Sequence, residues 1–92
     1  MSDETSDHLI QELRGQISDN DRAIVKALNK RIELVGRLKK YKDAHDIPFV
    51  DPQQEESVLR DLARANRGPL SQDGLRDLFR QILDLTKRKV AD

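Results

Sequence analysis

The amino-acid sequence predicts an all-α fold with three helices per chain, the first of them long, in an intertwined antiparallel homodimer. Three observations support this fold class. Apolar residues recur at helical spacing along most of the chain, only 3% of the residues are aromatic, and two groups of helix-breaking residues divide the sequence into three stretches. Ninety-two residues is the length of one small domain. We therefore expect a disordered N-terminal tail over residues 1–6 and a single helical domain over residues 7–92.

The first stretch, residues 7–43, contains no proline, and its weak points are Gly15 and Gly36. A helix of this length extends roughly 54 Å, whereas a compact chain of this size has a radius of gyration of about 12 Å. Because two short helices cannot bury such a rod, we expect a second copy of the chain to cover it in an antiparallel, two-fold symmetric dimer. The alternative is a kink near Gly36 that gives a compact four-helix monomer. Steps of three, four and seven dominate the apolar positions, which are Leu9, Ile10, Leu13, Ile17, Ile24, Leu28, Ile32, Val35 and Leu38.

The second and third stretches each begin at a helix-capping residue. Asp51 is the predicted N-cap of the second helix, with Pro52 at the first helical position and Gln54 as the reciprocal partner of a capping box. This helix is expected to end at residues 66–69, which contain both glycine and proline. Ser71 then caps the third helix, whose apolar residues are Leu75, Leu78, Phe79, Ile82, Leu83 and Leu85.

Composition narrows the class of protein. Lysine plus arginine equals aspartate plus glutamate, so the net charge is zero, and no concentrated basic tail indicates nucleic-acid binding. The absence of cysteine removes disulfide, thiolate and zinc-cluster chemistry. No apolar run approaches the roughly 20 residues of a membrane span, and the N-terminus is acidic rather than a signal peptide. We expect a cytoplasmic protein that binds no metal, membrane or nucleic acid.

Three cations on the first helix lie in or beside the apolar stripe. Arg31 falls between Leu28 and Val35 in that stripe. Lys42 follows 11 residues later, which returns it to within about 20° of the same helix face, some 16 Å along the axis. Arg14 lies about 25 Å from Arg31 along the helix and roughly 100° around it, so only the Arg14 of an antiparallel second copy could join the other two. Such a group would grip a small dianion of about 10 Å across.

These charges also have ordinary structural roles. Each cation could extend along the edge of the interface or pair with a carboxylate such as Glu33, Asp21 or Glu55. Glu55 lies one turn into the second helix, where we expect backbone N–H groups to be free for a ligand oxygen and the helix dipole to add positive potential. As a purely structural residue, Glu55 would only stabilise that first turn. The cationic run at residues 87–89 is interpreted as a solvated face or as charges favoured by the helix dipole.

Four short motifs follow one another along the chain, namely Leu13-Arg14-x-x-Ile17-x-x-x-Asp21, Lys30-Arg31-x-Glu33-Leu34, Lys39-x-x-Lys42 and Asp51-Pro52-x-x-Glu55. Their order and spacing resemble the all-helical (AroQ-type) chorismate mutases. The resemblance covers residues 9–87 and extends through the turn at residues 68–69 and the helix segment at residues 78–82. These last two segments especially resemble forms attached to the first enzyme of the shikimate pathway.

The resemblance implies an intertwined dimer that converts chorismate to prephenate, the committed step towards phenylalanine and tyrosine, without a cofactor. It implies that Arg14 of one subunit and Arg31 of the other hold the two carboxylates of the substrate. Lys42 would contact a carboxylate and the ether oxygen of the breaking bond. Glu55, with the backbone near Asp51, would bind the ring hydroxyl.

Two positions depart from the family pattern. Gln54 stands where the family usually has an arginine, and Val90 stands where a glutamine or glutamate usually donates a hydrogen bond to the ether oxygen. Thr86 occupies a position where a small polar residue is common. With fewer donors, the enzyme would be slow, would need a partner enzyme of the shikimate pathway, or would act on 4-amino-4-deoxychorismate or isochorismate. The non-enzymatic alternatives are a ligand-sensing or partner-binding domain and a helical dimerisation module.

Overall fold

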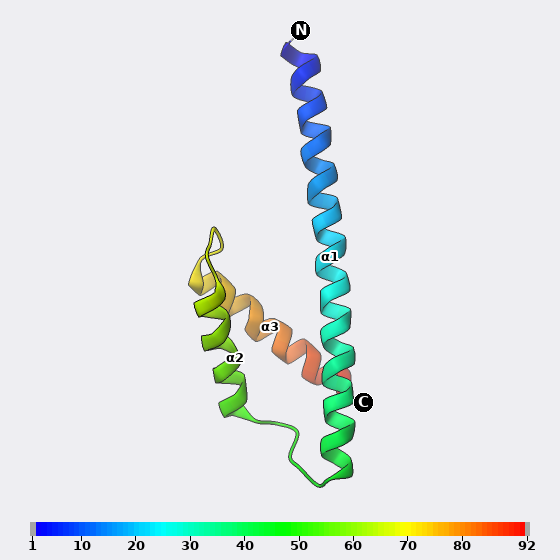
Figure 1. Cartoon of the computed structure of the whole chain (residues 1–92), viewed down its shortest axis with the longest axis vertical. Helices are drawn as coiled ribbons and strands as arrows, with labels where there is room; N and C mark the ends of the chain where they lie inside the picture. The colour runs from blue at the N-terminus through cyan, green and yellow to red at the C-terminus, as the bar shows by residue number, and fades with distance from the viewer. Residues whose placement is uncertain (1, 92) are drawn as a thin grey trace. The chain divides into compact units, whose positions relative to one another are not determined.

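The computed structural model describes residues 2–91, with side chains from residue 6 onward. It contains three α-helices, α1 (Ser2–Ala44), α2 (Pro52–Ala65) and α3 (Gln72–Val90), and no strand among the residues described (Figure 1). The predicted all-α class with three helices and a long first helix is therefore confirmed. The chain divides into two compact units, Met1–Arg31 and Ile32–Asp92, and each is described by itself.

Helix α1 extends further towards the N-terminus than the sequence predicted. It begins at Ser2 rather than near Asp7, and it ends at Ala44, next to the predicted end at Asp43. No glycine or proline precedes Gly15, so no helix breaker opposes this extension. The helix also runs through Gly36, so the described chain lacks the fourth helix of the alternative fold. Met1 lies outside the described residues, and the disordered tail and the domain boundary at residue 7 stay predictions.

The helix of the first unit is almost entirely exposed. Among residues 6–31, only Leu28 and Arg31 are half-buried. A single helix in water is marginally stable, and most helices in proteins owe their stability to packing of an apolar face. Here that face has no cover within the first unit. Its side chains retain exposed fractions between 44% and 60%, and they belong to Leu9, Ile10, Leu13, Ile17 and Ile24.

The second unit contains the hairpin of α2 and α3 (Figure 1). Its small core consists of Leu59 from α2 with Leu75 and Leu83 from α3. The C-terminal end of α3 also approaches the last part of α1, because Val90 Cγ1 lies 3.9 Å from the place where a Cβ on Gly36 would stand. The last part of α1 thus lies against the end of α3 in this unit.

Side-chain caps fix where α2 and α3 begin, as the sequence predicted. The Asp51 carboxylate accepts a hydrogen bond from the Gln54 N–H at 3.1 Å, and Ser71 Oγ accepts one from the Gly74 N–H at 3.0 Å. Helix α2 ends at Ala65, directly before the predicted stop. In that stop, Gly68 has a φ of +76°, a left-handed conformation that suits glycine. The reciprocal capping role of the Gln54 side chain stays a prediction.

Candidate functional site

The eight residues predicted for the site divide between the two units. Arg14 and Arg31 lie on α1 in the first unit, where Arg14 is exposed and Arg31 is half-buried. Arg14 forms no ion pair with any residue in the described part of the chain. Its charge is therefore available to a ligand or to a second chain. The second unit holds the remaining six, namely Lys42, Asp51, Gln54, Glu55, Thr86 and Val90.

Lys42 is a half-buried cation in the last turn of α1. Its carbonyl accepts a hydrogen bond from the Ile47 N–H at 2.8 Å, so the following loop folds back on the helix end. The neighbouring Lys39 has partners, because its ammonium pairs with Asp43 at 2.7 Å and lies 5.9 Å from the centroid of the Phe49 ring. Within residues 6–91, no carboxylate pairs with Lys42. In that part of the chain, Lys42 thus presents an uncompensated positive charge.

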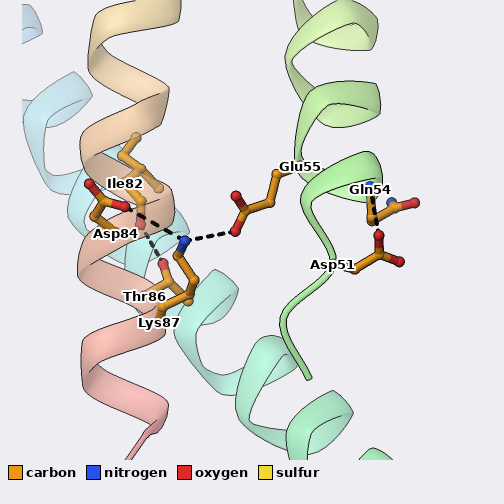
Figure 2. A network of polar contacts seen from close by, with 7 residues as sticks. All are labelled: Asp51, Gln54, Glu55, Ile82, Asp84, Thr86 and Lys87. Carbon is orange, nitrogen blue, oxygen red and sulfur yellow. Dashed lines mark hydrogen bonds and ion pairs between the residues drawn. The ribbon is translucent and has the colours of Figure 1, made fainter. Parts of the chain in front are cut away.

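The start of α2 holds three of the predicted residues. Asp51 occupies two backbone donors there, since its carboxylate accepts from the Gln54 N–H and its carbonyl accepts from the Glu55 N–H, each at 3.1 Å. The expectation that these N–H groups are free for a ligand oxygen is wrong for these two positions, because the cap itself satisfies them. Gln54 is exposed and points away from α3, whereas Glu55 is half-buried and points towards it (Figure 2).

Glu55 forms an ion pair across the hairpin that the sequence did not predict. Lys87 of α3 brings its Nζ to 2.9 Å from Glu55 Oε1 and to 3.7 Å from Asp84 Oδ1 (Figure 2). The hydrogen bond to Glu55, together with the attraction of both carboxylates, raises the pKa of Lys87 above its ordinary value of 10.5. The interpretation of Lys87 as a merely solvated or dipole-stabilising charge is therefore wrong. A cation does lie against Glu55, and it comes from α3 rather than from position 54.

The two predicted residues near the end of α3 have different surroundings. Thr86 is only 3% exposed, and its hydroxyl donates a hydrogen bond to the Ile82 carbonyl one turn earlier at 2.7 Å. Val90 is half-buried beside Gly36. Both residues follow Leu83 of the hairpin core along α3. Their roles towards a ligand stay predictions.

Glu55 also lines a cleft on the hairpin of about 280 Å³. The other lining residues are Pro52, Glu56, Leu59, Arg80, Leu83 and Asp84, so carboxylates predominate among its charged groups. Among the described residues, no group of three or more His, Asp or Glu side chains is placed to hold a metal ion. In the same part of the chain, no helix is long and apolar enough to cross a membrane.

Comparisons with known proteins identify what the chain is similar to. Residues 13–90 match the family model for chorismate mutase type II. The T-protein of Haemophilus influenzae is 31% identical over 77 residues, which cover 80% of this chain and 20% of that protein. The bifunctional chorismate mutase/prephenate dehydratase of Aquifex aeolicus is 28% identical over 78 residues, which cover 80% of this chain and 22% of that protein. The chain thus spans about a fifth of the length of these curated relatives.

Proposed function

Because the chain belongs to the chorismate mutase type II family, we propose that it is an isomerase that converts chorismate to prephenate in the biosynthesis of phenylalanine and tyrosine. The observation that carries this proposal is the family match, which extends over residues 13–90 and so includes every residue assigned to the site. The relative from Aquifex aeolicus carries chorismate mutase in its own name, which supports the same activity.

The proposed site is shared between two subunits. Arg14 of one subunit and Arg31 of the other bind the two carboxylates of chorismate, and Lys42 binds a carboxylate and the ether oxygen. Neither Arg14 nor Lys42 pairs with a carboxylate of the described chain, which supports these roles, because such a cation gains most from an anionic ligand. Glu55 accepts a hydrogen bond from the ring hydroxyl.

The reaction suits such a site. The rearrangement is unimolecular, so the protein contributes by holding the enolpyruvyl arm over the ring in the reactive conformation. Negative charge develops on the ether oxygen as its bond to the ring breaks. An ammonium fixed at that oxygen therefore stabilises the transition state more than the ground state, and this difference accelerates the reaction. The chemistry requires no nucleophile, proton relay or cofactor.

An antiparallel homodimer completes this proposal. The exposed apolar stripe of α1 supports it, since a second copy of the chain would bury side chains that keep about half of their surface exposed in the first unit. The two departures at Gln54 and Val90 leave fewer donors at the reacting atoms. If the isolated protein is slow, we expect a partner enzyme of the shikimate pathway to raise its rate.

The direct test follows the loss of chorismate by ultraviolet absorbance and identifies the product by chromatography. Prephenate formed at an ordinary enzymatic rate, on the order of 1–1,000 per second, would support the proposal and would mean that Gln54 and Val90 are tolerated. Pyruvate release from isochorismate would instead assign a lyase activity on that substrate. Turnover of 4-amino-4-deoxychorismate alone would instead make that compound the substrate. Binding of chorismate without turnover would instead favour a sensing domain.

A further inference from the structure

Two ion pairs connect α2 to α3, and they involve consecutive residues of α2. Lys87 pairs with Glu55 at 2.9 Å, and Arg76 pairs with Glu56 at 2.6 Å. The first pair is the more enclosed, with side chains 32% and 31% exposed against 45% and 47% for the second. Only the first pair includes a residue, Glu55, that the proposed function assigns to substrate binding. The two pairs therefore offer a matched comparison between a site contact and a structural contact.

The Lys87 ammonium changes what Glu55 can bind. A carboxylate accepts several hydrogen bonds, so the contact of Lys87 with Oε1 leaves Oε2 available for a ligand donor. Asp84 at 3.7 Å adds a second attraction that holds Lys87 in place. The charge of Lys87 offsets part of the negative charge of Glu55 and Asp84, which weakens the local attraction for a cationic ligand group beside the Glu55 carboxylate.

We propose that Lys87 is a positioning residue that also determines specificity: it orients the Glu55 carboxylate and offsets its charge, so that the site prefers a neutral ring hydroxyl to an ammonium group at the same place. This inference rests on the proposed function. Because an aliphatic amine is cationic at neutral pH, 4-amino-4-deoxychorismate would bring a positive charge close to Lys87. In a partly solvated site, repulsion between two unit charges a few Å apart is worth roughly tenfold or more in kcat/KM.

The experiment compares kcat/KM for chorismate and for 4-amino-4-deoxychorismate in the wild-type protein and in four variants. Lys87→Met should lower the preference for chorismate by roughly tenfold, because the bare Glu55 carboxylate then attracts the ammonium. Lys87→Gln, a second neutral variant, should do the same, whereas Lys87→Arg should keep the wild-type preference. Arg76→Met, which breaks the other cross-hairpin ion pair, should leave the preference unchanged. Circular dichroism checks that each variant is folded.

The outcomes separate this inference from the proposed function. If the wild-type protein converts chorismate but folded Lys87→Met and Lys87→Gln keep the wild-type preference, the specificity role of Lys87 is overturned. An equal loss on both substrates would assign Lys87 a structural role only and would also overturn it. If the wild-type protein converts neither substrate, the proposed function itself fails, and the inference fails with it.

Discussion

Among single residues, Lys42 differs from its neighbour Lys39 in one respect that matters for chemistry: Lys39 pairs with Asp43, whereas Lys42 pairs with no carboxylate of the described chain. We expect Lys42→Ala to reduce kcat about a hundredfold or more, because a donor at the developing charge is lost. Lys39→Ala is the matched control and should retain most of the activity, since a partly exposed ion pair contributes little. Steady-state kinetics measure both. Near-normal turnover by folded Lys42→Ala would contradict the assigned role.

The Lys87 ion pair predicts a dependence of stability on pH. Because folding raises the pKa of Lys87 above 10.5, its stabilising contribution is fully present below that value and is lost as the pH rises through the raised pKa. Lys87→Met should therefore lower the free energy of unfolding by about 0.2–1 kcal/mol near neutral pH and by almost nothing above the raised pKa of Lys87. Arg76→Met should lower the free energy of unfolding by the same amount at both pH values, because arginine stays protonated. Urea unfolding at both pH values checks this, and an unchanged cost of Lys87→Met would refute it.

At the scale of the elements, the cap of α3 predicts a measurable loss of stability. Ser71 Oγ accepts a hydrogen bond from the Gly74 N–H at 3.0 Å, and α3 carries Thr86, Lys87 and Val90. Ser71→Ala should lower the free energy of unfolding by about 1 kcal/mol, whereas Ser71→Asp should keep the cap and most of the stability. Urea unfolding of both variants measures the difference. Equal stability of the alanine variant and the wild type would mean that the cap contributes nothing.

The helices themselves could largely be predicted from the sequence, because their signals are local. Asp51 and Ser71 cap helices where their positions indicated, and α2 ends before the turn with Gly68. The start of α1 was misplaced because no residue there marks a boundary. The pair of Glu55 and Lys87 could not be predicted, since it depends on how α2 and α3 pack and on which face each helix presents.

For the whole molecule, the balance between buried and exposed apolar surface supports the proposed association of two chains. Three apolar residues of the described chain are buried, and they are all leucines of the hairpin. The long apolar stripe on α1 is left exposed within the first unit, in a chain too short to form a large core. Its position in the sequence was predicted correctly. What covers it could not be read from one chain, because we expect the partner surface to belong to a second molecule.

The shared site gives the strongest test of the proposed dimer. If each site takes Arg14 from one subunit and Arg31 from the other, Arg14→Ala and Arg31→Ala are each inactive alone, but a hybrid dimer contains one site with both arginines. Random exchange between equal amounts makes half of the dimers hybrid, and one of the two sites in each is intact. Mixing should therefore restore about a quarter of the wild-type activity. The measurement is chorismate turnover before and after mixing, with exchange checked by differently tagged subunits.

The variant that lacks both arginines provides the control when it is mixed with an equal amount of wild type. Every site of a hybrid dimer then misses either Arg14 or Arg31, so exchange should lower the activity of the mixture from about half to about a quarter of that of an all-wild-type sample. If both arginines serve a site within one chain, each hybrid keeps one intact site and the activity stays at about half. The shared site would be overturned if subunits exchange but activity neither returns in the first mixture nor falls in the second. Both results would mean that a single subunit supplies Arg14 and Arg31 to each site.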